Sequence, residues 1–152
     1  MATVNARYIL NGFLDIDEDL REVEEELAYL EEQRDNLSSS YDFDKVRNKT
    51  NRISDPTSLA AIRFIEMEAE LHNRRIDDIY LRNKYRSLVQ RIGRDEARVL
   101  LSKYADHQSN EAVAYKYKMS VSWVKVKDKN GREKLQGIIN DMSAEELKQY
   151  YR

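Results

Sequence analysis

Lysine side chains concentrate in one stretch of the chain, between residues 116 and 129. Five lysines fall within these fourteen positions, and the only acidic residue among them is Asp128. Lysine ammonium groups bind phosphate oxygens as point charges, while serine, indole and valine side chains can reach base edges and thymine methyl groups. The pattern predicts a DNA-binding surface made by Lys116, Lys118, Ser120, Val121, Ser122, Trp123, Lys125, Val126, Lys129 and Arg132.

Three predicted helices would position these side chains. Apolar residues recur at helical spacing in three successive segments: Ala97, Leu100, Leu101 and Tyr104; Val113, Ala114 and Tyr117; Val121 and Val124. A turn at residues 118–120 predicts a left-handed backbone at Lys118 and a helix cap from the Ser120 hydroxyl. We expect Gly131 to interrupt the third helix. A basic helix after such a turn fits a major groove, which is typical of a helix-turn-helix.

The same segments allow a different interpretation, in which a three-helix bundle binds a protein partner instead of DNA. Trp123 would then belong to the core of that bundle. The density of lysines around it favours DNA as the ligand, because such a surface neutralises phosphates.

Charge is distributed unevenly along the chain, although the formal net charge is only −2. Residues 1–37 include three basic and eleven acidic residues, a net charge of −8. Residues 82–139 include fourteen basic and six acidic residues, a net charge of +8. Polyanion binding is therefore expected of the second segment and not of the first.

A heptad pattern begins at Ala6 and continues for more than four repeats. Its apolar positions alternate in steps of three and four, with one polar interruption at Arg34: Ala6, Ile9, Phe13, Ile16, Leu20, Val23, Leu27, Leu30 and Leu37. The intervening residues are mostly Glu and Asp, so the pattern predicts a long acidic helix with an apolar seam. Gly12 is expected to weaken this helix, or to precede its true start.

A second long helix is expected to begin at Pro56, with Asp55 as its cap. Its predicted seam consists of Ile62, Ile65, Ala69, His72, Ile76, Ile79 and Asn83. The two seams predict an antiparallel coiled-coil hairpin, joined by a loop at about residues 38–55.

Assembly of more than one copy is also expected from this hairpin. Phe64, Leu71 and Leu81 lie off the second seam and would stay in water if the hairpin were alone. We therefore expect a homo-oligomer, with a dimer favoured, assembled through residues 6–86.

These elements together predict an all-α fold. Residues 1–88 would form the coiled-coil hairpin and serve oligomerisation, and residues 89–140 would form the helix-turn-helix domain. Residues 141–152 would form a short C-terminal helix, for which Ser143 and Glu146 have the spacing of a capping box.

Two parts of the sequence resemble transcription proteins. The segment with Lys103-Tyr104, Val113-Ala114, Met119-Ser120 and Val124 resembles region four of bacterial sigma factors. The chain is similar to the ArpU/RinA family of phage late-operon transcriptional regulators in three features. These are the Glu-rich first helix, the motif Ser54-Asp55-Pro56-Thr57 and this sigma-like segment. The resemblance covers roughly residues 10–140.

The family resemblance implies a phage or prophage activator of late genes, which works in the cytoplasm of a bacterial host. It implies double-stranded DNA as a partner and allows contact with host RNA polymerase. Two alternatives stay open. One is a small terminase subunit of DNA packaging, although such proteins usually place the DNA-binding unit first. The other is a protein module that acts on RNA polymerase without binding DNA.

Other classes of function find little support in the residues. The chain has no Cys, no glycine-rich phosphate loop and no order of residues that indicates a nucleophile, so we expect no enzyme, cofactor or small-molecule substrate. Asp15, Asp17, Asp19 and Glu26 match a calcium-loop template, but Leu20 replaces the glycine of its turn. The two histidines, His72 and His107, fall in separate segments, so no metal site is expected. No apolar run approaches the length of a membrane span.

Overall fold

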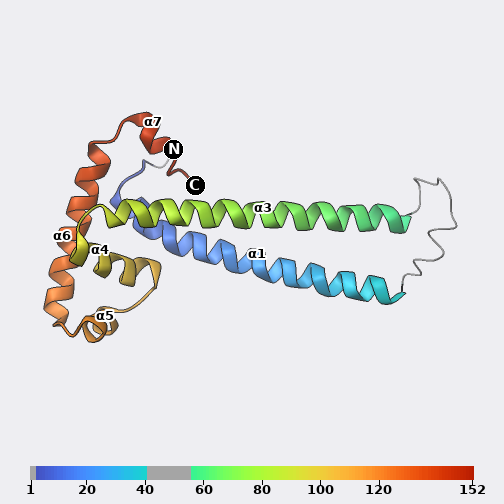
Figure 1. Cartoon of the computed structure of the whole chain (residues 1–152), viewed down its shortest axis with the longest axis horizontal. Coiled ribbons are helices and arrows are strands. Elements are labelled where there is room, and N and C mark those ends of the chain that lie inside the picture. Colours follow the sequence, from blue (N-terminus) through green and yellow to red (C-terminus); the bar gives the residue numbers. More distant parts are fainter. Residues whose placement is uncertain (1–2, 41–55) are drawn as a thin grey trace. The chain divides into compact units, whose positions relative to one another are not determined.

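The computed structural model describes residues 3–40 and 56–152, and no strand occurs in these ranges. The elements are α1 (Ala6–Ser40), α3 (Pro56–Gln90), α4 (Arg94–Leu100), the π-helix η1 (Leu101–Ala105), α5 (Asn110–Tyr117), α6 (Val121–Asn140) and α7 (Ala144–Lys148) (Figure 1). The expected all-α class is confirmed. The predicted cap Asp55 and most of the predicted loop fall outside the described residues, whereas residues 38–40 continue α1.

Two compact units share the two long helices. Of the described residues, 19–77 form the two-helix unit, and 3–18 and 78–152 form the multihelical unit. The boundary expected between residues 88 and 89 therefore lies inside the multihelical unit. The first turns of α1 and the last turns of α3 belong with the short helices because they pack among them; the Ala6 amide, for example, donates to Gln136 Oε1 of α6 at 2.9 Å.

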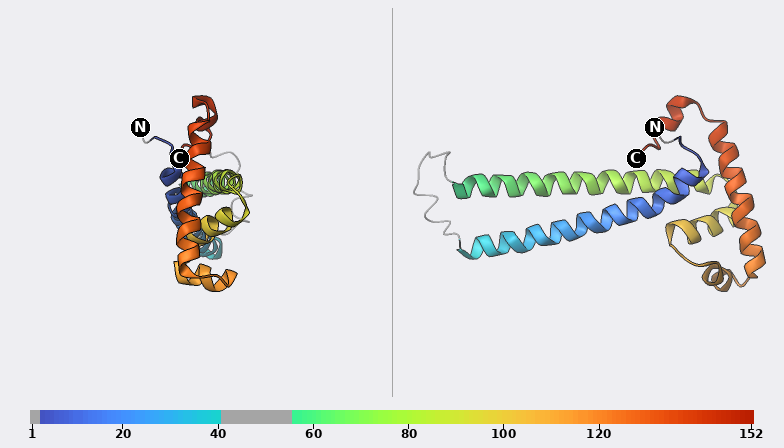
Figure 2. Two further views of the ribbon diagram at one scale, coloured as in Figure 1. Left: turned by 90° about the vertical axis from the view of Figure 1, so that its left-hand side faces the viewer. Right: turned by 180° about the vertical axis from the view of Figure 1, so that it is seen from behind.

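In the two-helix unit, α1 and α3 run antiparallel and lie side by side (Figures 1 and 2). Their apolar contact is made by Val23, Leu27, Leu30, Phe64 and Leu71. Arg34, the polar interruption of the first seam, pairs with Glu68 of α3, with 3.6 Å between Nη1 and Oε2. The α1 side of this contact belongs to the predicted heptad, which bears out that seam over residues 23–30. The side chain of Leu37, the last predicted position, lies outside what the structure describes.

The seam predicted on α3 is wrong. Its isoleucines Ile62, Ile65, Ile76 and Ile79 are 50, 66, 62 and 42% exposed. The side chains expected to stay in water are the ones that pack: Phe64 and Leu71 contact α1, and Leu81 is half-buried.

The rotation of α3 about its own axis explains this reversal. Phe64 and Leu71 are one heptad apart, so they share one face of the helix. A helix can turn only one stripe of its surface toward a neighbour, and this stripe includes the large Phe64 ring, whose burial removes much apolar area from water.

Tyr85 occupies the centre of the multihelical unit. Its hydroxyl donates a hydrogen bond to the Tyr150 carbonyl oxygen at 2.5 Å, and its ring centroid lies 6.0 Å from that of Phe13. Burial raises the pKa of the Tyr85 phenol above its usual range, so the hydroxyl stays protonated and remains a donor. Tyr85 thus joins α1, α3 and the C-terminal residues.

The helix α1 passes through Gly12 without interruption, contrary to the expected weakness there. A Cβ added at Gly12 would lie 2.4 Å from Tyr85 Cε2. The glycine is needed because the Tyr85 ring lies directly against the backbone of α1 at this position.

The continuity of α1 also excludes a calcium loop. Asp15, Asp17, Asp19 and Glu26 all lie on this one uninterrupted helix, which makes no loop at Leu20. Over residues 3–40 and 56–152, no three His, Asp or Glu side chains are grouped so that they could hold a metal ion. None of the helices in these ranges combines the length and the apolar composition that crossing a membrane requires.

Replacing Gly12 with Ala should test the contact with Tyr85. Either the ring or α1 must move to accept the new methyl group, so we expect the free energy of unfolding to fall by about 1–3 kcal/mol. Urea denaturation followed by circular dichroism measures this change. Gly137→Ala in α6 is the matched control, because nothing lies within 4 Å of the added Cβ. It should be neutral or stabilising by up to about 1 kcal/mol. Equal effects of the two substitutions would contradict the close packing at Gly12.

Candidate nucleic-acid interface

Helices α4, α5 and α6 pack around a small apolar cluster. Its buried members are Val99, Val113, Ala114 and Val124, and the half-buried Tyr117, Val121 and Trp123 pack against them. Each helix contributes to the cluster, and Ala114 is small enough to let α5 and α6 approach closely. The cluster fixes how α6 lies against the two helices before it.

The connection between α5 and α6 has the predicted geometry. Lys118 has φ 56° and ψ 40°, a left-handed conformation that directs the chain out of α5. The Met119 amide then donates to the Ala114 carbonyl oxygen at 2.9 Å. The Ser120 hydroxyl accepts from the Trp123 amide at 3.1 Å and caps α6. Both local predictions for this turn, at Lys118 and at Ser120, are confirmed.

The inner face of α6 is a continuous buried stripe, formed by Val124, Asp128, Gly131, Leu135 and Ile139. The helix runs through Gly131 to Asn140, so the interruption expected at this glycine is wrong. A Cβ at Gly131 would lie 3.0 Å from Leu100 Cδ1 and 3.2 Å from Glu96 Cβ. The glycine therefore permits α4 and α6 to pack closely instead of ending α6.

Asp128 faces inward and binds η1. It accepts from Lys103 Nζ at 2.7 Å and from the Tyr104 hydroxyl at 3.3 Å, and Arg132 Nε lies 3.4 Å from it. Burial, together with the charge of Asp128, raises the pKa of the Tyr104 phenol above its usual value, so Tyr104 stays a donor. The sequence pattern suggested an acid among the exposed lysines, but this carboxylate is turned away from them.

Glu96 of α4 makes the second charged contact with α6. It accepts from Lys134 Nζ at 2.9 Å, and Lys127 Nζ lies 3.8 Å away. The hydrogen bond from Lys134 is the main reason why the pKa of Glu96 is lowered from its usual value. Lys127, counted with the phosphate-binding lysines from the sequence alone, is thus directed toward α4.

The remaining lysines of this region are exposed. Lys116, Lys118, Lys125 and Lys129 form no ion pair with any carboxylate of residues 3–40 and 56–152. Ser122 and Val126 are exposed as well, and with Lys125 and Lys129 they follow the outer face of α6. We call these six residues the basic surface. The structure thus separates exposed lysines from those used to hold α6 in place.

Four of the predicted site residues lie elsewhere than on this exposed face. Val121 and Trp123 are half-buried in the apolar cluster, so both contribute to packing. The Ser120 hydroxyl is engaged as a cap. Arg132 interacts with Asp128 and points into a cleft.

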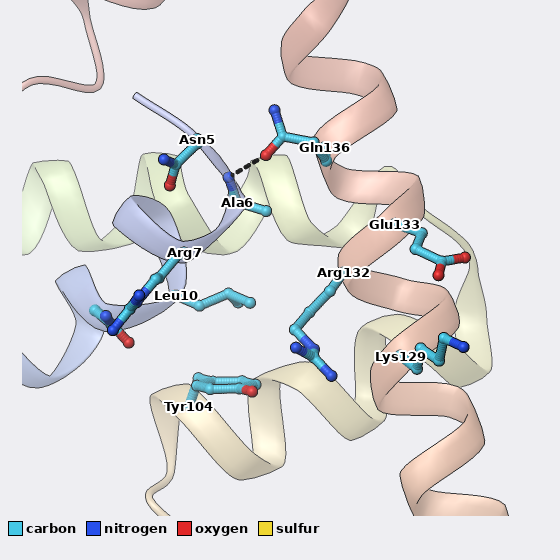
Figure 3. A pocket seen from close by; sticks show the side chains of 10 residues that line it. Asn5, Ala6, Arg7, Leu10, Tyr104, Lys129, Arg132, Glu133 and Gln136 are labelled. Carbon is cyan, nitrogen blue, oxygen red and sulfur yellow. Dashed lines mark hydrogen bonds between the residues drawn. The ribbon is translucent and has the colours of Figure 1, made fainter. Parts of the chain in front are cut away.

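This cleft, of about 770 Å³, lies between the start of α1, Tyr104 of η1 and the outer side of α6 (Figure 3). Arg7, Tyr104, Lys129 and Arg132 are among its lining residues, and Glu133 is the acidic one. Arg7 was missed in the sequence because it lies in the acidic N-terminal segment. Only the packing of α1 beside α6 brings it near the basic residues of α6.

Comparison with models of protein families, with curated proteins and with solved structures found no match to this chain. The resemblance to sigma region four and to the ArpU/RinA regulators therefore stays a prediction that rests on the residues quoted above.

The turn between α5 and α6 can be tested with two substitutions of opposite effect. Ser120→Ala removes the cap and should lower the free energy of unfolding by about 1 kcal/mol. Lys118→Gly relieves the left-handed strain and should be neutral or stabilising by up to about 1 kcal/mol. Thermal and urea denaturation of the full chain measure both. A clear loss of stability in Lys118→Gly would mean that the left-handed conformation is not where the structure places it.

The contact of Glu96 with Lys134 should make stability depend on pH. Because the pKa of Glu96 is lower in the folded chain, its contribution is complete above the unfolded value, near 4.5, and is lost as the pH falls through the folded value. Glu96→Gln should therefore lower the free energy of unfolding at about pH 7, and its difference from the wild type should shrink in acid. Urea denaturation over about pH 3–7 measures this difference. Glu133→Gln, at an exposed carboxylate of α6, is the matched control for the loss of one negative charge and should change the free energy of unfolding at about pH 7 by less than Glu96→Gln does.

Proposed function

We propose that α5, the turn at residues 118–120 and α6 form a helix-turn-helix that binds double-stranded DNA. The observation that carries this proposal is the basic surface, on which four lysines are exposed without a described carboxylate partner. The other cations nearby, Lys103, Lys127 and Lys134, are used to hold α6. A surface that keeps its lysines free of ion pairs is suited to phosphate oxygens.

In this proposal α6 enters the major groove, which is wide enough for one helix. Ser122, Lys125 and Val126 lie in its first turns, where a recognition helix contacts base edges. The Val126 methyl groups suit a thymine methyl group, and the Ser122 hydroxyl suits a base-edge donor or acceptor. Lys116, Lys118 and Lys129 would contact the phosphates on either side.

The cleft beside α6 extends this surface. Arg7 and Arg132 line it together with Lys129. A guanidinium group can bind a phosphate through two hydrogen bonds, so these residues would contact the backbone next to the groove. Arg7 is therefore added to the DNA-binding residues proposed from the sequence.

The biological role proposed for the chain is regulation of transcription. Its support is the turn between α5 and α6 with exposed lysines around it, and the resemblance of the sequence motifs to phage late-gene activators. Footprinting on the promoters of the neighbouring genes, followed by transcription from the protected promoter, tests this role. Activation would distinguish a regulator from a DNA-packaging subunit, which would protect a site without changing transcription.

Exposed apolar side chains favour a second candidate, a protein partner on the same surface. Tyr115 is 89% exposed, and Met119 and Val126 are about half exposed. Aromatic and methionine side chains of this kind are enriched at protein interfaces. Binding to RNA polymerase without any binding to DNA at low salt would support this candidate over the first.

The salt dependence of DNA binding tests the basic surface. Each contacted phosphate contributes about −0.9 to the slope of log affinity against log salt. We expect Lys125→Ala/Lys129→Ala to weaken binding to a random-sequence duplex and to make this slope shallower by about one to two. Fluorescence anisotropy across a series of salt concentrations measures both quantities.

A variant with the same loss of charge elsewhere is the control for this experiment. Arg21 and Lys148 are exposed cations outside the basic surface, so Arg21→Ala/Lys148→Ala should leave the slope unchanged. Unchanged affinity and slope in the Lys125/Lys129 variant would exclude this face of α6 as the DNA contact.

A further inference from the structure

The outward face of α3 carries an apolar stripe that no described part of the chain covers. Seven large apolar side chains of α3 are exposed by 42–66%: Leu59, Ile62, Ile65, Met67, Ile76, Ile79 and Tyr80. All of them except Met67 lie on or beside one heptad seam, whose positions alternate in steps of three and four from Ile62 to Ile79. This pattern is typical of a helix that packs against another helix, yet α1 lies against a different face, that of Phe64 and Leu71.

We propose that this stripe binds the same stripe of a second copy, as an antiparallel pair of α3 helices. The two-fold axis would pass between Glu70 and Leu71, so that each residue of the seam meets the seam residue at the same distance on the other side of the axis. Residues on the flanks of the seam meet with an offset of two positions. A two-fold interface of this kind brings one patch against itself and closes the assembly at two chains.

The residues of the stripe match each other in this register. Ile62 meets Ile79 of the second copy, and Ile65 meets Ile76. In the central layer the small Ala69 meets the larger His72, so that a large side chain fills the space left by a small one. Every isoleucine of the stripe thus faces an isoleucine of the second copy. Because the pair is symmetric, the contact of Ile62 with Ile79 occurs at both ends of the interface.

The residues beside the seam also match. On one flank Leu59 lies opposite Tyr80 of the second copy, two apolar side chains that are about half exposed or more in the single chain. On the other flank Glu68, which already pairs with Arg34 of its own chain, lies opposite Arg75 as a second cation. Arg75 is exposed, and no ion pair is seen for it among the described residues. Symmetry repeats both contacts, and no two like charges meet across the seam.

A parallel pair would use the stripe less well. It would place His72 against His72 of the second copy in the central layer, where two imidazoles would have to be buried together. It would also place Arg75 beside Tyr80, and Glu68 beside Asn73, so the complementary contact of Glu68 with Arg75 would be lost. The matching of side chains therefore favours the antiparallel arrangement.

This inference does not depend on DNA binding. It refines the dimer expected from the sequence, because the contact is made by the seam that was expected to lie inside the hairpin. The proposed function and the proposed assembly can fail separately, since the basic surface lies on α5 and α6 and the stripe on α3.

Light scattering of the full chain at about 50 µM tests the assembly. We expect a mass of about 36 kDa, twice the 18.0 kDa of one chain. Ile65→Glu/Ile76→Glu places charges in two layers of the stripe and should halve that mass. Met67→Glu, at an exposed apolar residue of α3 outside the stripe, should leave it unchanged. A wild-type mass near 18.0 kDa, or a dimer that survives the double substitution, would overturn the proposal.

Disulfide cross-linking tests the orientation and does not rely on a destabilised variant. The chain has no cysteine, so single cysteines can be introduced without competition. A mixture of Ile65→Cys and Ile76→Cys chains should cross-link to each other under mild oxidation, and neither should cross-link to itself. In the antiparallel register, Ile65 and its own counterpart are eleven residues apart along the helix, about 16 Å. Disulfides between two Ile65→Cys chains or between two Ile76→Cys chains, without any between the two variants, would overturn the antiparallel pairing.

Discussion

One buried tyrosine constrains both long helices. The Tyr85 ring lies against the backbone of α1 at Gly12, and its hydroxyl donates to the Tyr150 carbonyl oxygen. Within the multihelical unit, Tyr85 thus decides which side of the last turns of α3 faces inward. Within the two-helix unit, Phe64 and Leu71 face α1, and the isoleucines of α3 stay exposed as an apolar stripe on an otherwise charged helix.

Two buried carboxylates fix the orientation of α6. Asp128 forms an ion pair with Lys103, and Glu96 forms ion pairs with Lys134 and Lys127. A buried carboxylate without its cation would be costly, so these contacts specify which side of α6 faces inward. The lysines that remain are directed outward without ion pairs among the described residues. The lysines of the basic surface are therefore those of this region that neither buried carboxylate binds.

Features that depend on a few neighbouring residues were predictable from the sequence. The seam of α1, the left-handed Lys118, the Ser120 cap and the capping box of Ser143 with Glu146 are all present. Each arises from interactions within one or two turns of the chain, so the local residue types are enough to specify it. The exposed lysines of the candidate site were also found, because the types and spacing of residues on one helix face do not depend on distant partners.

Features that depend on distant partners were decided only by the tertiary structure. The sequence of α3 offers two apolar stripes of similar spacing, and only the packing of Phe64 and Leu71 against α1 decides between them. Asp128 stands among lysines in the sequence, but packing against η1 turns it inward. Gly12 and Gly131 are typical of helix weak points, whereas here they make room for Tyr85 and Leu100. The sequence by itself determined where helices form and which residues are basic; the packing of side chains decided which faces are left for partners, because space and charge are shared between residues far apart in the chain.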